Sequence, residues 1–583
     1  MLPHVVPRPR FFQRTSPAAI LLTLVLIAPA IALGAEPDEA PLSAAEDNTP
    51  SPAAAPNSVG MVPHHEAAAN LSTAAVDDTF RHRFWLVDPR ARPSKPESNL
   101  MKLEIHGEYQ LRYTKLTDLA LSNYAFPDYR QSLGQNQRLE HRMRFTPHFA
   151  YRKSFNVVAQ FDAPYGLLLG DATDHVVGSR GPISETQPMT LAFRWLFADY
   201  RFERGKITFG QQPSRWGLGL LFDSGDERQF LGDTRLGTIV ERLAFVGKPF
   251  GPDTKFELLM ATDWVYADAK TRWLDGDRAL RAMAGLSYVE SPGRRIGLLV
   301  VGERFQPHFA QPELAAVRPS ETTATFDLAA QTAFPVPGQA AHIVAESEIA
   351  AVLGSSDVSP EIFASRNAKV RRFGALARIG AVGTRGSGER RWGQWGLMLE
   401  WGYASGDADP TDGVDRRFVT NPSRRVGLIL FDEVMRWRSA RARVVLEDAR
   451  LGQRSMASSA MLPTEGGVAG ATYLSLQWLY RPLPNFDLRA ASLFAQTSSD
   501  LVDPARLVTS GRWSNFDGGN SAHRDLGIEL DLATEWRKPL DNGLGVSVGA
   551  EGGLLLPGRA LADVAERTLG SQALIRGRFG FYF

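Results

Sequence analysis

The stretch "MKLEIHGEYQLRYTKL", Met101 to Leu116, alternates between apolar and polar residues along its whole length. Leu103 and Ile105 fall on one side of the alternation, and Glu104 and Arg112 fall on the other. Successive side chains of a strand point to opposite faces, so this period of two predicts a strand with one apolar and one polar face. Strands of globular sheets average about five or six residues, whereas a tilted strand needs about ten to cross a bilayer. The stretch is long enough to cross.

The same alternation recurs along the chain, and the connections between the alternating runs fall into two classes. It is clear at 155–162, 256–266, 525–536 and 543–556. Eight short connections, rich in Pro, Gly and charge, lie near residues 151, 203, 248, 290, 334, 383, 481 and 538. Longer polar stretches separate them at 116–136, 163–190, 213–233, 268–277, 307–320, 354–368, 404–468, 498–522 and 557–571.

This sorting of connections by length predicts the architecture. Eight short turns join sixteen strands, and a first strand near Leu100 and a last one near Leu574 make about eighteen. An even number of long strands, with both ends of the chain on the short-turn side, is typical of bacterial outer-membrane barrels. The sequence therefore predicts an all-β fold at 99–583, a transmembrane antiparallel β-barrel of about eighteen strands with short periplasmic turns and long extracellular loops.

The stretch 404–468 departs from the strand pattern. Within it, "LFDEVMRWRSARARVVLEDARL" has Val434, Trp437, Ala440 and Val444 near helical spacing, which favours an amphipathic helix. Three arrangements follow for 404–468: a plug folded into the lumen, a long extracellular loop, or two further strands that would raise the count to twenty.

The first residues indicate the compartment. Arg8, Arg10 and Arg14 precede an apolar run at 18–32, and small residues follow it. This order of basic, apolar and small residues predicts a signal peptide at 1–34. The next segment, 35–98, is rich in Pro, Ala and Ser without periodicity, which predicts a disordered periplasmic tether. We therefore expect an outer-membrane location after cleavage.

Composition excludes several classes of function. Lys and Arg total 65 against 64 Asp and Glu, so nothing favours a nucleic-acid partner. Cys is absent, which rules out disulfides, thiolate metal sites and a Cys nucleophile. The sequence has no Walker loop, no GxGxxG turn and no HExxH motif. It predicts no enzyme, no cofactor and no metal.

The polar faces of the predicted strands carry ionised residues of both signs. A small dry interior could not hold so many charges, whereas a wide water-filled lumen could. The residues predicted to line the lumen are Glu104, Glu108, Arg112, Arg142, Arg144, Glu346, Glu348, Arg372, Arg378, Glu400, Glu529, Asp531, Glu535, Glu551, Arg576 and Arg578.

Two loop stretches hold clustered carboxylates. One contains Asp223, Asp226, Glu227 and Asp233, and the other contains Asp407, Asp409, Asp412 and Asp415. Such clusters can take up a divalent cation, but the second departs from an EF-hand register. The sequence favours solvated acidic loops.

The ending "LIRGRFGFYF" resembles the C-terminal assembly signal of Gram-negative outer-membrane proteins. The resemblance rests on Phe579, Phe581, Tyr582 and Phe583. It implies recognition by the outer-membrane assembly machinery, with the Phe face toward lipid and the arginines of this strand toward the lumen.

Two further stretches resemble large porins and the eighteen-stranded alginate-export barrels. They are "NQRLEHRMRFTPHFAYRKSFNVVAQFD" and "FADYRFERGKITFGQQPSRWGLGLLFDSGD". The resemblance implies passage of an anionic polysaccharide along an arginine-lined lumen. Acidic residues share the same faces, so a lumen of mixed sign is expected rather than strong anion selectivity.

These observations predict a passive outer-membrane channel for hydrophilic solutes, and the alginate-export resemblance adds a polysaccharide to the candidate solutes. The expected partners are outer-membrane lipid, lipopolysaccharide, the assembly machinery and the solute. The alternative is a structural or adhesive barrel that binds partners through its long loops. A barrel enzyme is less favoured than either.

Overall fold

The computed structural model describes residues 101–583, except 121–136, 153, 171–189, 227–228, 234–236, 252, 292, 309–317, 338, 340, 360–366, 386–391, 448–458, 460, 484 and 541–542. The expected signal peptide at 1–34 and tether at 35–98 lie outside these described residues. Within them, no helix is both long enough and apolar enough to cross a membrane.

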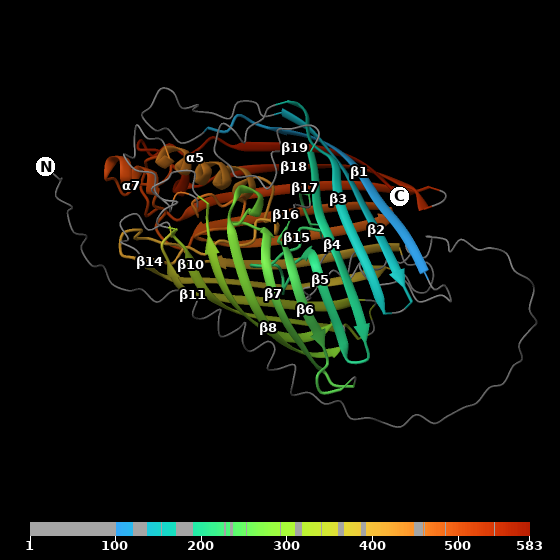
Figure 1. Ribbon diagram of the computed structural model, residues 1–583. Helices are drawn as coiled ribbons and strands as arrows, with labels where there is room; N and C mark the ends of the chain where they lie inside the picture. The colour runs from blue at the N-terminus through green and yellow to red at the C-terminus, as the bar shows by residue number, and fades with distance from the viewer. Residues whose placement is uncertain are drawn as a thin grey trace, which may run out of the picture. The chain divides into compact units, whose positions relative to one another are not determined.

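Nineteen strands form one sheet, and eighteen of them are the staves of a closed barrel (Figure 1). These are β1 (Met101–Leu116), β2 (Gln137–Tyr151), β3 (Phe155–Gly170), β4 (Thr190–Phe202), β5 (Gly205–Pro213), β6 (Ile239–Gly247), β7 (Phe256–Ala267), β8 (Arg278–Ser291), β9 (Arg294–Gln306), β10 (Glu321–Pro335), β11 (Ala341–Ser356), β12 (Ala368–Arg385), β13 (Trp392–Ala404), β15 (Ala471–Leu483), β16 (Phe486–Thr497), β17 (Asp525–Pro539), β18 (Gly545–Pro557) and β19 (Gln572–Tyr582).

Each stave pairs antiparallel with the next along the chain, and β1 pairs with β19 to close the ring. At this seam Arg112 lies opposite Arg578 and Tyr113 lies opposite Gly577. Phe583 extends the seam, because its backbone and that of Gly107 exchange hydrogen bonds of 2.8 and 3.0 Å. The predicted fold class and strand number are confirmed.

The remaining elements are short. They are the two-residue strand β14 (Val414–Asp415), the 3₁₀ turns η2 (Trp273–Asp275) and η6 (Arg559–Leu561), the π-helical turn η3 (Leu430–Met435), and the helices α5 (Arg436–Glu447) and α7 (Pro504–Ser510). Strand β14 pairs parallel with β12 rather than taking a place in the ring. In Figure 1, α5 and α7 lie together near one end of the barrel.

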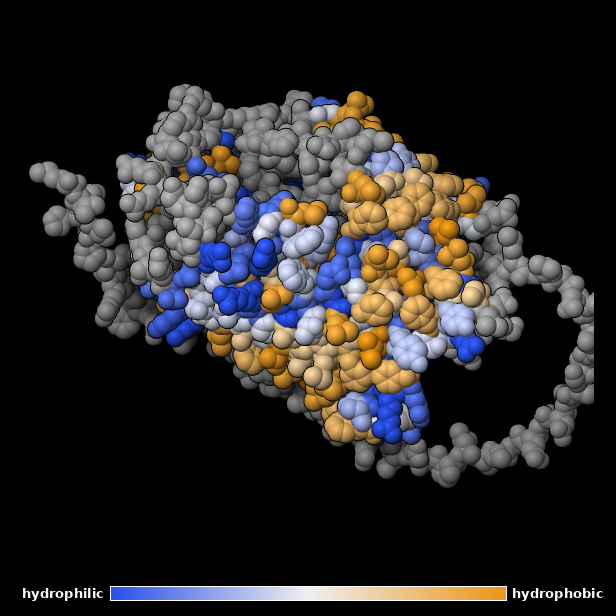
Figure 2. Space-filling model, viewed as in Figure 1, coloured by the Kyte–Doolittle hydropathy of each residue, from blue (hydrophilic) through white to orange (hydrophobic). Residues whose placement is uncertain are grey.

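The staves carry the predicted two-faced pattern. On β1, Leu103 and Ile105 are 65% and 55% exposed, whereas Glu104 between them turns inward toward His148. The outward positions of the other strands are also largely apolar, and Leu243, Leu532 and Ile575 are among the most exposed side chains. Figure 2 shows hydrophobic residues gathered over the half of the visible wall away from the helices. An apolar outer band around a closed barrel is how strands span a membrane.

Two long connections turn inward rather than outward. We call the described residues of 213–233 (213–226 and 229–233) the first lumen segment, and those of 404–468 (404–447, 459 and 461–468) the second lumen segment. The second holds η3 and α5, so the predicted helix is confirmed. Helix α5 does not have the expected division into a buried apolar face and an exposed polar face. Both apolar and arginine side chains of the helix are buried, including Trp437, Arg438 and Arg441. Of the three arrangements considered for 404–468, the described part of the stretch, residues 404–447, 459 and 461–468, shows the infolded one.

Candidate functional site

All sixteen residues predicted to line the lumen lie on the inward face of the barrel. Their ion-pair partners lie on nearby strands of the same face or in the lumen segments. Seven of them are buried, namely Glu346, Glu348, Glu400, Glu529, Asp531, Glu551 and Arg576. The lumen segments contribute to this burial, because they contact Glu348, Glu400, Glu529 and Glu551 directly.

The first lumen segment folds back on itself and packs on an apolar part of the inner wall. The Trp216 N–H donates to the Phe222 carbonyl at 3.0 Å, and the Ser214 N–H donates to the Thr238 carbonyl at 2.8 Å. The side chains of Trp216 and Phe222 then join a cluster with Leu259, Met283, Leu299 and Val301 of β7 to β9. Part of the inward face of these strands is therefore apolar, although Arg281 of β8 and Glu303 of β9 lie on the same face.

Glu348 of β11 fixes the turn of this segment. Its carboxylate accepts backbone N–H groups from Leu218 and, at 3.2 Å, from Leu220. Gly217 has a φ of +55°, and a Cβ there would stand 2.6 Å from the Glu348 carboxylate. Glycine thus allows the backbone to approach the wall. Glu348 anchors a backbone turn, in addition to lying on the inward face.

Seven arginines on neighbouring strands form what we call the arginine wall. They are Arg112 on β1, Arg138, Arg142 and Arg144 on β2, Arg194 on β4, and Arg576 and Arg578 on β19. Four strand carboxylates pair with them: Glu108, Glu140, Asp162 and Glu551.

The lumen segments supply further carboxylates to the arginine wall. Asp226 lies 2.6 Å from the Arg194 guanidinium and 3.1 Å from that of Arg144. Asp233 lies 2.6 Å from Arg112 and 2.7 Å from Arg578.

Burial by itself would raise the pKa of Asp233, but the neighbouring arginines Arg578 and Arg112 hold this pKa well below its usual range.

The second lumen segment supplies one further carboxylate to the arginine wall. Glu433 lies 3.4 Å from Arg138.

The expectation of solvated acidic loops is wrong for the first acidic stretch. Asp223, Asp226 and Asp233 are all buried inside the barrel. In the second stretch Asp409 and Asp412 belong to local turns, whereas Asp415 is buried and lies 2.6 Å from Arg372 of β12. Among the described residues, no group of three or more potential ligands could hold a metal ion.

The second lumen segment is also attached to the wall through charged groups. Glu529 of β17 accepts backbone N–H groups at the start of η3, from Ile429 and Leu430, both at 2.7 Å. Glu400 of β13 lies 2.7 Å from Arg424 and accepts the Tyr473 hydroxyl at 2.7 Å. These contacts position the start of the helical stretch formed by η3 and α5.

A cavity remains between the two lumen segments and strands β8 to β12, and the open space in it and at its mouth amounts to about 1050 Å³. Its charged lining consists of Asp268, Lys270, Arg281, Glu303, Arg372, Asp415 and Arg417. Phe222 and Phe418 supply aromatic surface, and Thr323, Thr325 and Asn421 supply uncharged polar groups. The Arg372 guanidinium lies 2.6 Å from the carboxylate of Asp415, which also lines the cavity, and 2.7 Å from the carboxylate of Glu321, which does not.

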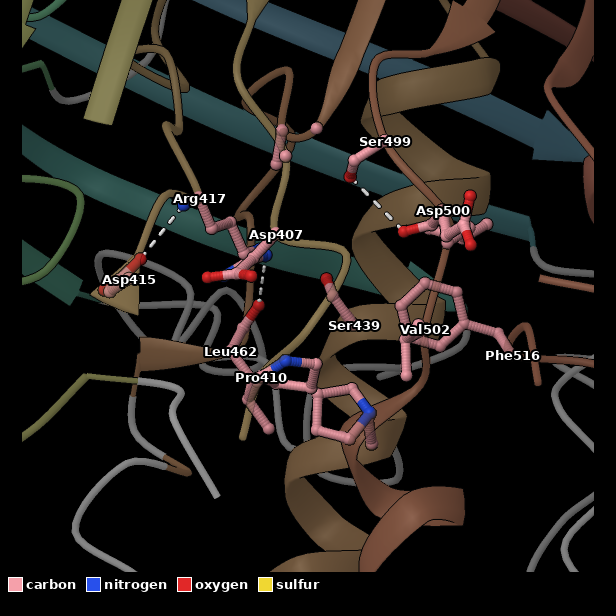
Figure 3. Close-up of a pocket in the computed structure, with 16 residues that line it drawn as sticks. Asp407, Pro410, Asp415, Arg417, Ser439, Leu462, Ser499, Asp500, Val502 and Phe516 are labelled. Atoms are coloured by element: carbon pink, nitrogen blue, oxygen red, sulfur yellow. Dashed lines mark hydrogen bonds between the residues drawn. The ribbon is translucent and has the colours of Figure 1, made fainter. Parts of the chain in front are cut away.

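A second cavity of about 670 Å³ lies among the loops beside α5 (Figure 3). Asp415 and Arg417 line both cavities, so the Arg417 side chain stands between them. Its guanidinium donates to the carbonyls of Met461 and Leu462 at 3.0 and 2.8 Å. Burial lowers the pKa of Arg417 to about 10, which leaves it cationic at neutral pH.

Several residues of this interior were absent from the predicted set. Arg138 and Glu140 continue the alternation of Arg142 and Arg144, so the period of two would have found them. Arg194 lies in a stretch with aromatic residues on both faces, which hid it. No local signal marks Asp226 or Asp233, because their partners lie on distant strands.

A GxSxG match at Gly545–Gly549 has a structural rather than a catalytic setting. It lies inside strand β18. Ser547 therefore does not occupy the strand-to-helix turn on which a nucleophile elbow depends.

No family model matches the sequence, and no curated protein matches it either. Solved structures resemble its fold. OccAB3 of Acinetobacter baumannii gives a TM-score of 0.46 at 10% identity, over 82% of this chain and 100% of that one. OccK2 (OpdF) of Pseudomonas aeruginosa gives 0.44 at 10% identity, over 82% and 97%. OpdK of the same organism, solved with vanillate, gives 0.42 at 9% identity, over 82% and 98%.

These similarities concern the fold alone. The protein's own features are a closed ring of eighteen staves, an apolar outer face and an inner face that carries charges of both signs. Together they describe an outer-membrane, porin-like β-barrel.

Proposed function

We propose that the protein is a passive outer-membrane channel for small hydrophilic solutes. The observation that carries the proposal is the cavity between the lumen segments and strands β8 to β12, which is lined by charged and uncharged polar groups. A membrane barrel with such an interior supplies the polar surroundings that a hydrophilic solute needs while it crosses the apolar layer.

The lumen segments define the proposed pathway. They occupy much of the interior and leave separate spaces on the two sides of Arg417. A pathway of this kind filters by size and by fixed charge, since a solute must pass between charged side chains held at short range. This favours small solutes over the polysaccharide suggested by the alginate-export resemblance, because a long polymer would have to displace both segments.

Purified protein in planar lipid bilayers tests the proposal. We expect discrete conductance steps in KCl, which decrease when a permeant organic solute occupies the pathway. Complete absence of conductance from correctly folded protein would contradict the channel. Folding is checked independently by heat-modifiable migration on gels.

A second candidate is a structural or adhesive barrel whose lumen is plugged. The observation that favours it is the burial of the lumen segments, as shown by Leu430, Trp437 and Ala440, none of which has exposed surface. A barrel of this kind would bind partners through its long loops. It predicts folded protein without conductance, together with binding of whole cells or surface polymers to the loops.

We also propose the expected partners on the same basis. The apolar outer band would contact membrane lipid, and lipopolysaccharide on its outer side. Phe579, Phe581, Tyr582 and Phe583, at the barrel seam, would be read by the assembly machinery. Loss of correct insertion after alanine substitution of these four residues would support this assignment.

A further inference from the structure

We propose that Asp226 and Asp233 act as internal counter-ions, which occupy the arginine wall and keep the channel from being anion selective. The inference rests on the proposed channel function and deepens it, because it names the residues that set selectivity between charges.

Each of the two carboxylates bridges arginines of different strands. Asp226 joins Arg144 of β2 to Arg194 of β4, with nitrogen–oxygen distances of 3.1 and 2.6 Å. Asp233 joins Arg112 of β1 to Arg578 of β19, with distances of 2.6 and 2.7 Å. Both aspartates are 4% exposed, so they are enclosed between the segment and the wall. They stand where the anionic group of a solute would meet the arginines.

Among the described residues, the ion pairs of the arginine wall draw carboxylates both from the strands and from the lumen segments. The ion pairs described above join seven arginines to seven carboxylates, of which four belong to strands and three to the lumen segments. Without Asp226, Asp233 and Glu433, the seven arginines of this set would face four carboxylates. A positive excess of this kind in a confined lumen raises the local concentration of anions.

Backbone contacts hold the first lumen segment in place independently of the two aspartates. The Gly232 N–H donates to the Glu551 carboxylate at 3.1 Å, and the Asn421 N–H donates to the Leu220 carbonyl at 2.8 Å. Glu348 holds the turn at Leu218 and Leu220. An aspartate at either position can therefore lose its charge while the segment remains seated.

The arginines also keep other partners when an aspartate is neutralised. Arg112 retains Glu140 at 2.7 Å and Arg578 retains Glu551 at 2.7 Å. Arg112, at 20% side-chain exposure, is the most accessible of the arginines paired by the two aspartates. Asparagine has nearly the shape of aspartate without its charge, so Asp226→Asn and Asp233→Asn would add positive charge to the lumen with little change in its width.

The test is the reversal potential of the full-length protein in planar bilayers under a KCl gradient. We expect the wild type to have a chloride-to-potassium permeability ratio within about threefold of unity. The double variant Asp226→Asn/Asp233→Asn should raise this ratio by about fivefold or more, with each single variant in between. Asp233→Glu, which keeps the charge, should leave the ratio near that of the wild type.

Asp409→Asn is the matched control, because it removes one carboxylate from an exposed turn of the second lumen segment. It should leave the ratio unchanged. A wild type that is already strongly anion selective would overturn the inference without any variant, and so would a conducting double variant with the wild-type ratio. Absence of conductance in the wild type would instead contradict the channel itself, so the two failures are distinguishable.

Discussion

The carboxylate of Glu529 on the barrel wall lies 2.7 Å from the backbone nitrogen of Leu430, at the start of the helical stretch that fills the lumen. The first N–H groups of a helix have no partner within it, and the N-terminus carries partial positive charge. Here a residue about a hundred positions away supplies the cap. The same device recurs at Glu348, which holds the turn of the first lumen segment.

Glu529→Ala removes the acceptor for three buried backbone N–H groups. We expect the free energy of unfolding to fall by about 2–4 kcal/mol, because buried donors left without an acceptor are costly. Urea unfolding in lipid vesicles, followed by tryptophan fluorescence, measures the change. Glu529→Gln should lower the free energy of unfolding by less, because the glutamine amide oxygen can still accept hydrogen bonds from these N–H groups.

Glu290→Ala is the control for that experiment. Glu290 lies at the end of β8 and makes only a 3.8 Å ion pair with the partly exposed Arg294. Loss of the Glu290 carboxylate should change the free energy of unfolding by less than about 0.5 kcal/mol. Equal effects of the two alanine variants would contradict the role of Glu529 as a cap.

Trp216→Ala should destabilise the protein through loss of packing. Trp216 is 3% exposed and lies against apolar residues of the inner wall. Truncation of a buried tryptophan costs about 3–5 kcal/mol, measurable by the same unfolding experiment. Trp273→Ala, at a site 47% exposed, should cost little. If the two losses match, the first lumen segment is not packed on the wall as described.

Arg417→Ala should increase single-channel conductance, because the Arg417 side chain stands between the two interior cavities. Removal of the Arg417 side chain would join the two cavities without changing any barrel strand. The control is Arg416→Ala, at an arginine that is 41% exposed and pairs with Asp412 at 2.8 Å. An unchanged conductance for Arg417→Ala would show that solutes do not pass this residue.

The loop around Asp407 should depend on pH. Burial raises the pKa of Asp407 from 3.8 to about 6, with the neighbouring Asp415 adding to the rise and the Arg416 side chain opposing it. A carboxyl with a raised pKa in the folded state contributes stability that is full below about pH 4 and is lost as the pH rises through about 6. Limited proteolysis should therefore cut this loop more slowly at pH 5 than at pH 7.

Asp407→Asn mimics the protonated carboxyl, so the difference in cutting rate between pH 5 and pH 7 should shrink. The rates are corrected with an unstructured peptide substrate for the pH dependence of the protease. A wild-type loop that is more resistant at pH 7 would contradict the assigned direction.

Gly107→Val should impair closure of the barrel. A Cβ at Gly107 would lie 2.1 Å from the ring of Phe583, which covers it at the seam of β1 and β19. The Phe583 ring has to leave its place over β1 to relieve that clash, which removes its packing at the seam, so we expect a lower yield of the heat-modifiable folded form. Gly302→Ala on β9 is the control, because a Cβ there meets no atom within 4 Å. Equal folding yields would contradict the importance of this contact.

Much of the barrel could be predicted from the sequence, because its signals are local. The pleat of a strand alternates Leu103, Glu104 and Ile105 between faces whatever lies around them. The lengths of the connections then indicate the number of barrel strands and the end of the barrel at which each turn lies. For the same reason the sequence placed Arg576 and Arg578 on the inward face and Phe579 on the outward face, as the structure shows.

The interior could not be predicted in the same way, because its contacts join residues that are remote in sequence. Asp226 meets Arg144 across 82 positions, and Asp233 meets Arg578 across 345. An acidic stretch in a long connection looks the same whether it faces water or an arginine wall. The sequence by itself thus determined a two-faced, closed barrel. Only the tertiary structure decided that two connections fold into its lumen and that its arginines are paired, since desolvation and ion pairing depend on which distant side chains meet.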